Sequence, residues 1–171
     1  MLKDYGHIAR ELEPQDEMLH DRLARCAAKT KDVCEFLAEL GLVPPDGQIK
    51  LRAVYQDACH LAHAQRVRDQ PRQLLSCVNG LTIVPIAEPD ICCGAAGSYN
   101  LTEPEMSDRL AQRKLQNILA VNPQAVITGN VGCSMQIQAA LRQARRDIWV
   151  AHPMELLDLS YRGAAPPVRG T

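Results

Sequence analysis

The chain has 171 residues, of which 46% are hydrophobic and 23% charged, and its formal net charge at pH 7 is −1. This length and composition are typical of one compact globular domain with a sizeable core. The near-neutral charge and the aromatic content of 4% offer neither a basic field for phosphates nor stacking platforms for bases, so we expect no nucleic-acid partner. The apolar runs are too short for a membrane span and residues 1–4 do not begin a secretory signal, so we expect a cytoplasmic protein.

The first predicted element is a long N-terminal helix over residues 16–40. Its apolar side chains recur at alternating steps of four and three residues, and Gly41 ends the pattern. Residues 42–47 contain Pro-Pro and Asp-Gly pairs, which predict a turn-rich connector. We therefore expect residues 1–46 to form an N-terminal helical segment.

Residues 47–162 alternate between strand and helix patterns. The predicted strands cover residues 49–56, 81–86, 125–128 and 148–151. The predicted helices cover residues 64–77, 102–121, 134–146 and 153–161. This alternation predicts an α/β fold with a parallel sheet and crossover helices on both faces. The tail, residues 163–171, is rich in Pro, Gly and Ala and is predicted to be disordered.

Four of the seven cysteines follow predicted strands. They are Cys59, the adjacent pair Cys92 and Cys93, and Cys133, with 32 and 39 residues in the gaps. Because ligands of open parallel sheets collect outside the carboxyl ends of the strands, we expect these thiols to meet in one crevice. An odd number of cysteines in a reducing compartment favours ligands, redox groups or buried thiols over disulfides.

Four converging thiols favour an iron–sulfur cluster. Structural zinc more often uses close Cys-x-x-Cys knuckles, which this sequence lacks. Cys92 and Cys93 project in different directions as chain neighbours, so they suit different irons of one cluster. Two alternatives stay open: the same thiols hold zinc in an assembly or interaction module, or Cys92 and Cys93 act in a thiol–disulfide enzyme.

The remaining polar and sulfur-containing candidates have structural explanations. Cys26, Cys34 and Cys77 lie within or at the end of predicted helices, where free cysteine packs as a small apolar residue. His60 and His63 are candidate metal ligands or donors to cluster sulfur, and His152 is either a neighbour of the crevice or a helix cap. Asp57 and Asp90 precede cysteines and are typical turn or cap residues. A basic set is expected on solvated helix surfaces, with a docking face for an acidic partner as the alternative: Arg109, Arg113, Lys114, Arg142, Arg145 and Arg146.

Three motifs carry a family resemblance. They are Asp-x-Cys-His-Leu at residues 57–61, Cys-Cys-Gly-x-x-Gly at 92–97 and Gly-Asn-x-Gly-Cys at 129–133. Together they resemble the cysteine-rich CCG domain found in the B-type subunit of heterodisulfide reductase and in its relatives. Residues 54–101 and 3–7 resemble more narrowly the carboxyl-terminal part of the glycolate oxidase (glycolate dehydrogenase) iron–sulfur subunit, and the resemblance extends over residues 3–159.

The resemblance implies an electron-transfer subunit with a [4Fe-4S]-type cluster held by Cys59, Cys92, Cys93 and Cys133. Its expected partners are flavin-containing subunits that oxidise glycolate to glyoxylate, with peripheral association at the inner face of the membrane through the complex. No catalytic residue is expected on this chain.

Two features depart from the family pattern. Gln136 stands where the general motif ends in a further cysteine, which puts the completeness of the ligand set in question. The amino-terminal ferredoxin-like motifs and first cysteine-rich repeat of whole subunits do not occur in this sequence. We therefore expect a fragment or shortened gene product that is not catalytic alone.

Overall fold

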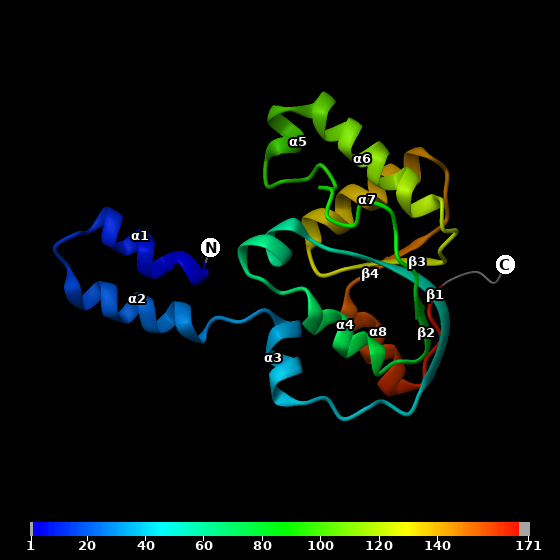
Figure 1. Cartoon of the computed structure of the whole chain (residues 1–171), viewed down its shortest axis with the longest axis horizontal. Coiled ribbons are helices and arrows are strands. Elements are labelled where there is room, and N and C mark those ends of the chain that lie inside the picture. Colours follow the sequence, from blue (N-terminus) through cyan, green and yellow to red (C-terminus); the bar gives the residue numbers. More distant parts are fainter. Residues whose placement is uncertain (1, 168–171) are drawn as a thin grey trace.

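A four-stranded parallel sheet forms the centre of the structure, a computed structural model that describes residues 2–167 (Figure 1). The strands are β1 (Gln48–Gln56), β2 (Asn79–Ile83), β3 (Ala125–Thr128) and β4 (Trp149–Ala151). Their order is β2-β1-β3-β4, and all three pairings are parallel. The central strands β1 and β3 are rich in apolar residues that are buried on both faces, as expected for a sheet covered on both sides. The predicted α/β fold is confirmed.

Helices cover both faces of the sheet. Helices α6 (Pro104–Leu119) and α7 (Val131–Gln143) pack on one face, against Val54 and Val126. Helices α3 (Val33–Leu40), α4 (Asp69–Ser76) and α8 (Pro153–Arg162) pack on the other face, against Ala53, Tyr55 and Ile127. Neighbouring residues of a strand point to opposite faces, so the two cores use alternate residues of the same strands.

The N-terminal helix is present but shorter than predicted. Residues 16–40 are divided into α2 (Glu17–Lys29) and α3. Asp32 starts α3 with a capping box: its carboxylate accepts from the Cys34 amide at 2.8 Å, and the Glu35 carboxylate accepts from the Asp32 amide at 3.1 Å. This cap interrupts the apolar stripe that runs across both helices.

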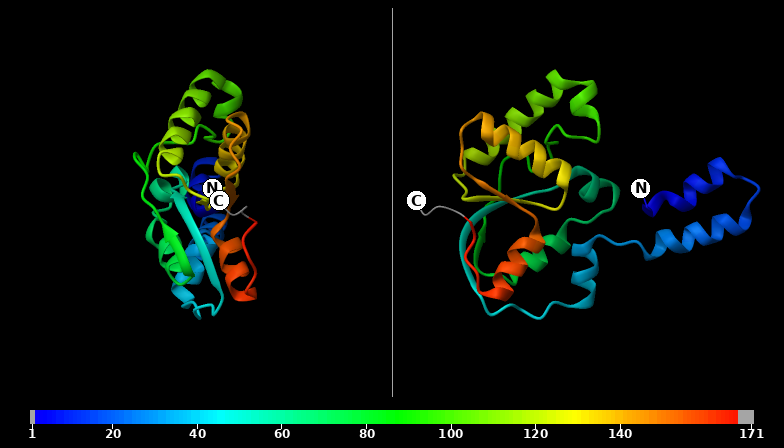
Figure 2. Two further views of the ribbon diagram at one scale, coloured as in Figure 1. Left: turned by 90° about the vertical axis from the view of Figure 1, so that its right-hand side faces the viewer. Right: turned by 180° about the vertical axis from the view of Figure 1, so that it is seen from behind.

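The residues before α3 form a helical hairpin that extends away from the sheet (Figures 1 and 2). A short 3-10 turn, η1 (Leu2–Asp4), leads into α1 (Tyr5–Leu12), which lies against α2. Gly6 allows this close packing, because a Cβ there would lie 3.1 Å from the Ala24 Cα. One tie to the rest of the chain is the ion pair of Lys3 with Glu35, at 2.7 Å.

Two further elements differ from the sequence prediction. The helix predicted over residues 64–77, with a kink or a fresh start at Pro71, is shorter in the structure: a π-helical turn, η2 (His60–Ala64), ends where it was expected to begin, and α4 starts at Asp69 with Pro71 in its first turn. Strand β2 covers Asn79–Ile83, so it begins and ends earlier than the strand predicted over residues 81–86. A short helix, α5 (Tyr99–Thr102), precedes α6, which has Pro104 at its first position as expected.

The chain after α8 is only partly described. Gly163 ends α8 in the left-handed conformation, and the Ala164 amide donates to the Leu159 carbonyl at 2.9 Å. The rest of the predicted disordered tail, residues 168–171, lies outside the described residues. Within residues 2–167, no helix combines the length and apolar character needed to cross a bilayer.

Candidate metal centre

The four predicted cysteines lie in three loops at the carboxyl edge of the sheet. Cys59 directly precedes η2 and follows the end of β1 closely. Cys92 and Cys93 lie in the long connection between β2 and α5, and Cys133 lies in the first turn of α7, just after β3. Parallel strands end at the same edge, so loops far apart in sequence meet there.

The cysteine side chains contact one another in two pairs. The side chains of Cys59 and Cys92 form one hydrogen bond, and those of Cys93 and Cys133 form another. Cys133 also interacts electrostatically with Cys59 and Cys92, so all four belong to one group. Cys93 and Cys133 are only 2% and 5% exposed, whereas Cys59 and Cys92 are half-buried. The structure therefore brings the predicted cysteines together, with two at the surface and two beneath.

Backbone amides of the Cys-Cys-Gly loop point at the cysteine sulfurs. The Gly94 amide donates to Cys92 Sγ at 3.4 Å, and the Ala95 amide lies near the Cys93 sulfur and favours its charged form. The hydrogen bond from Cys133, helped by the Ala95 amide, lowers the pKa of Cys93 to about 6. The same hydrogen bond, together with burial, raises the pKa of Cys133. Burial is also the main cause of the raised pKa of Cys92. Of Cys92, Cys93 and Cys133, Cys93 is the thiol most readily available as a thiolate.

A hydrogen-bonded relay holds the Cys-Cys-Gly loop against two helices. Gly94 has a φ of +90° and lies against Ser107 of α6. The buried Ser107 hydroxyl donates to the Gly94 carbonyl at 2.8 Å and accepts from Gln136 Nε2 of α7 at 3.2 Å. Gln136, which replaces the last cysteine of the general motif, thus braces the loop through Ser107.

We expect Ser107→Ala to lower the free energy of unfolding of the metal-free protein by about 1–2 kcal/mol, because the buried Gly94 carbonyl and the partly buried Gln136 amide lose this partner. Urea unfolding followed by circular dichroism measures this change. Ser76→Ala is the matched control, since Ser76 is exposed and bonds only within its own helix; it should change stability by less than about 0.5 kcal/mol. Equal losses in the two variants would contradict the relay.

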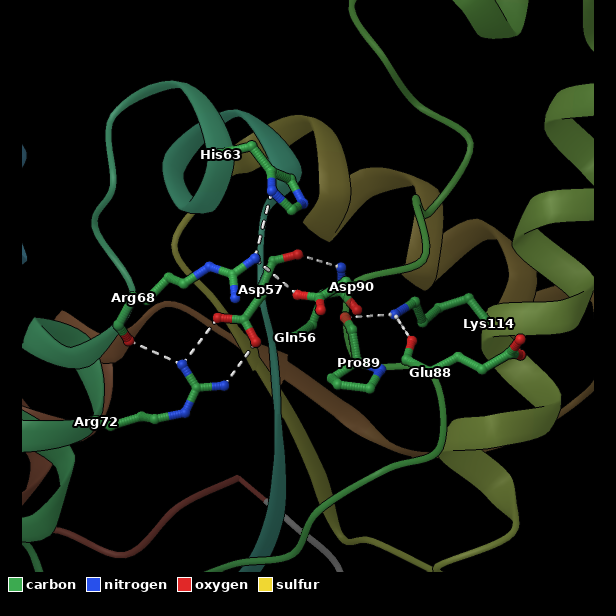
Figure 3. Close-up of polar contacts among 9 residues, drawn as sticks. All are labelled: Gln56, Asp57, His63, Arg68, Arg72, Glu88, Pro89, Asp90 and Lys114. Atoms are coloured by element: carbon green, nitrogen blue, oxygen red, sulfur yellow. Dashed lines mark hydrogen bonds and ion pairs between the residues drawn. The ribbon is translucent and has the colours of Figure 1, made fainter.

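Asp57 and Asp90 form ion pairs beside the cysteines (Figure 3). Arg72 of α4 holds the buried Asp57 carboxylate through two hydrogen bonds, of 2.8 and 2.6 Å, and its guanidinium lies 4.8 Å from the centre of the Tyr55 ring. Arg68 donates to Asp90 at 3.0 Å. Both aspartates therefore fix loops to the start of α4, and they do not form a carboxylate pair with each other.

The three candidate histidines make other contacts. His60 is exposed and lies 2.9 Å from the Gln65 side-chain nitrogen, and His63 is exposed and contacts Arg68 (Figure 3). His152 caps α8, with Nδ1 accepting from the Met154 amide at 3.2 Å. The capping interpretation of His152 is the one that the contacts show.

The other cysteines lie apart from this group. Cys34 is buried in the opposite core, and burial raises its pKa to about 12. Cys26 is exposed on α2, although its apolar stripe predicted packing, and Cys77 donates weakly to the Gln73 carbonyl at the end of α4. In the part of the chain that the structure describes, no three His, Cys, Asp or Glu side chains converge on the position of a single metal ion. A hollow of about 530 Å³ lies at the opposite edge of the sheet, around the first residues of β3 and β4.

Lys114 was predicted to lie on a solvated helix surface, and this prediction is wrong. The side chain is 1% exposed, and its ammonium donates to the carbonyls of Glu88 and Pro89 at 3.3 and 3.0 Å (Figure 3). Burial lowers its pKa, while the charges of Cys93, Asp57, Asp90 and Cys133 oppose the shift. Its neighbour Arg113 pairs with the Glu88 carboxylate at the surface. The sequence did contain a signal for the burial of Lys114, because Lys114 lies on the same helical stripe as the buried Ala111 and Ile118.

Comparison with known proteins supports the resemblance. Residues 53–138 match the CCG family, described as a cysteine-rich domain, and this range contains all four cysteines. The chain is 30% identical over 164 residues to a protein of Oceanobacillus iheyensis named "Lactate utilization protein A", covering 95% of this chain and 66% of that protein. It is 31% identical over 159 residues to the protein of the same name from Geobacillus thermodenitrificans, covering 92% and 65%. It is 31% identical over 144 residues to the "Probable glycolate oxidase iron-sulfur subunit" of Bacillus subtilis, covering 83% and 32%.

The chain thus spans 66%, 65% and 32% of the length of these three relatives. The match to the family covers residues 53–138, which include β3, most of α7 and every loop of the cysteine group. The chain belongs to the CCG family of cysteine-rich domains, and it is related to the glycolate oxidase and lactate utilization proteins.

Proposed function

We propose that this chain is an iron–sulfur electron-transfer subunit, or the carboxyl-terminal part of one, in a flavin-dependent glycolate oxidase. The observation that carries the proposal is the meeting of Cys59, Cys92, Cys93 and Cys133 at one edge of the sheet. Relatives that cover much of this chain are named as an iron–sulfur subunit and as lactate utilization proteins, which supports the same class of function.

The proposed ligands are the four cysteines, and the proposed group is a cluster of the [4Fe-4S] type. The donor set fits, because thiolates are the usual ligands of iron–sulfur clusters. The four cysteines contact one another in two pairs, and this arrangement suits a cluster in which each cysteine sulfur binds a different iron. The amides of Gly94 and Ala95 lie beside the sulfurs of Cys92 and Cys93, which is the kind of outer contact that tunes such sites.

When bound, the cluster would supply one-electron transfer. In the proposed complex, oxidation of glycolate to glyoxylate on another subunit would release two electrons and two protons, and a cluster held by Cys59, Cys92, Cys93 and Cys133 would pass the electrons on one at a time. The chain itself binds no substrate in this scheme. Its residues hold the cluster at the sheet edge, and Asp57 with Arg72 and Ser107 with Gln136 hold the surrounding loops in place.

Lactate is the second candidate substrate for the complex. The observation in its favour is that the relative covering 95% of this chain is named for lactate utilization. The oxidation is the same for both acids, since each loses two electrons and two protons at the carbon that bears the hydroxyl. The same proposal includes a flavin-containing partner and a peripheral position at the inner face of the membrane. It also divides the chain into a helical segment (1–46), a cysteine-rich domain (47–162) and a tail (163–171).

Anaerobic purification followed by iron, acid-labile sulfide and zinc analysis tests the proposal. We expect brown protein with about four irons and four sulfides per chain, from the [4Fe-4S] composition, and a paramagnetic signal after reduction. Reduction of the captured complex by glycolate or by lactate then separates the two substrates. Colourless protein with one zinc per chain would contradict the proposal and favour the alternative, a zinc-stabilised assembly module.

A further inference from the structure

Two buried polar side chains end the central strands next to the cysteines. Gln56 of β1 and Thr128 of β3 are register partners, and they are 1% and 0% exposed. Gln56 Nε2 donates to the Asp57 carbonyl at 2.7 Å, but Gln56 Oε1 and the Thr128 hydroxyl have no hydrogen-bond partner within the described chain. Buried polar atoms are nearly always hydrogen-bonded, so each of these two needs a physical explanation.

Strand alternation shows which way both side chains point. Val54 and Val126 lie two residues earlier on the same strands and belong to the core that includes Cys93 and Cys133. Because residues i and i+2 share a face, Gln56 and Thr128 project toward this core at its carboxyl end. They therefore lie between the apolar core under α6 and α7 and the cysteine loops.

Lys114 reaches the same region from α6. Its buried ammonium donates only to main-chain carbonyls of residues 88 and 89, and among residues 2–167 no carboxylate forms an ion pair with it. The charges that stabilise its cationic form belong mainly to Cys93, Asp57, Asp90 and Cys133. A lysine this deeply buried is rare unless its charge is compensated. The compensation that this arrangement offers comes from the carboxylates of Asp57 and Asp90 together with the cysteine site.

We infer that Lys114 and Thr128 are positioning residues that set the electron affinity of the cysteine site, Lys114 by its buried charge and Thr128 by a buried hydroxyl that has no partner within the described chain. The inference rests on the proposed function. Adding an electron makes a thiolate-held centre more negative, so a nearby cation and a hydroxyl donor stabilise the reduced form and raise its reduction potential. A purely structural role would leave the potential unchanged.

Thr128→Val and Lys114→Met test the inference in the anaerobically purified full chain. Valine keeps the shape of Thr128 without the hydroxyl, and methionine keeps most of the length of Lys114 without the charge. At the midpoint potential of the parent, we expect the ratio of reduced to oxidised cluster to fall about tenfold in Lys114→Met, which is a shift of about 59 mV for one electron. We expect a fall of about threefold in Thr128→Val, since one hydrogen bond is lost. A redox titration followed by visible absorption and electron paramagnetic resonance measures both.

Two matched variants make the result specific. Thr128→Ser should return the parental potential, because it keeps the hydroxyl. Ser160→Ala removes a buried hydroxyl that donates to the Gly47 carbonyl at the opposite edge of the sheet, and it should leave the potential unchanged. Urea unfolding of the metal-free variants records any separate effect on stability.

Parental potentials in cluster-loaded Thr128→Val and Lys114→Met would overturn the inference and leave the proposed function intact. Absence of iron and sulfide from the parent would refute both. If Lys114→Met does not fold, the pair Thr128→Val and Thr128→Ser decides the outcome.

Discussion

Cys93→Ser should abolish the visible chromophore of the anaerobically purified protein. Cys93 is 2% exposed and contacts Cys133, and the hydrogen bond from Cys133 lowers its pKa to about 6, which favours the metal-binding thiolate form at neutral pH. A serine hydroxyl stays protonated at that pH and is a harder donor than thiolate, so it is a poor ligand for iron. Because losing even an outer-shell partner costs about 10- to 100-fold in metal affinity, losing a direct ligand should weaken cluster binding by at least that factor, and the iron and sulfide content should fall with it. Absorbance and iron analysis on protein purified in parallel give the answer.

Cys26→Ser is the control for this experiment. Cys26 is exposed on α2, in the hairpin that extends from the sheet (Figure 2), and it is not one of the four interacting cysteines. Its replacement should leave colour, iron and sulfide at the parental level. Retention of the chromophore in both variants would show that Cys93 is not a ligand. Loss in both would show that the assembly of the site depends on thiols in general.

The sheet and the position of the cysteines could be predicted because both follow from local patterns. Apolar runs such as Ala125–Thr128 are bounded by turn residues and alternate with helical periods, which is typical of parallel α/β proteins. Once the sheet is parallel, a cysteine just after a strand must lie at the carboxyl edge. The positions of Cys59 and Cys133 in the sequence, each just after a strand, were therefore nearly enough to predict that the two residues lie at the same edge of the sheet.

The helix over residues 16–40 shows where periodicity misleads. The apolar stripe runs on from Cys26 to Val33, so the pattern predicts one helix. The break comes from the local capping box of Asp32 and Glu35, a signal that is present in the sequence but competes with the stripe. The same pattern predicted that Cys26 would be packed, but Cys26 is exposed because α2 lies in the hairpin rather than against the sheet.

Most contacts of the residues that surround the cysteines could not be predicted from the sequence. Arg72 pairs with Asp57, which is 15 residues away in the sequence, and Gln136 pairs with Ser107, which is 29 residues away, so neither pairing follows from local spacing. Lys114 lies on the buried stripe of α6, but a lysine at such a position is ordinarily assigned to the surface. Partners of this kind depend on how α4, α6 and α7 pack, which only the tertiary structure shows.

Gly94→Ala should destabilise the metal-free protein by about 2–5 kcal/mol, from the combined costs of overpacking and backbone strain. Gly94 has a φ of +90°, which residues other than glycine rarely adopt, and an added Cβ would lie 2.4 Å from the Ser107 carbonyl oxygen. To relieve this contact the loop must move away from α6, which breaks the bond from the Ser107 hydroxyl to the Gly94 carbonyl and displaces Cys93. We therefore also expect loss of iron binding. Urea unfolding and iron analysis measure the two effects.

Gly97→Ala is the matched control, because it lies in the same loop and separates strain from overpacking. Gly97 has a φ of +67°, yet an added Cβ would meet nothing within 4 Å. Its replacement should cost only the strain of a left-handed residue, about 1–2 kcal/mol, with the iron content unchanged. Similar losses of stability and iron in both variants would show that the close approach of Gly94 to Ser107 does not hold the cysteine pair. A large loss at Gly94 alone would establish that the third residue of the Cys-Cys-Gly motif is glycine because α6 leaves no room for a side chain.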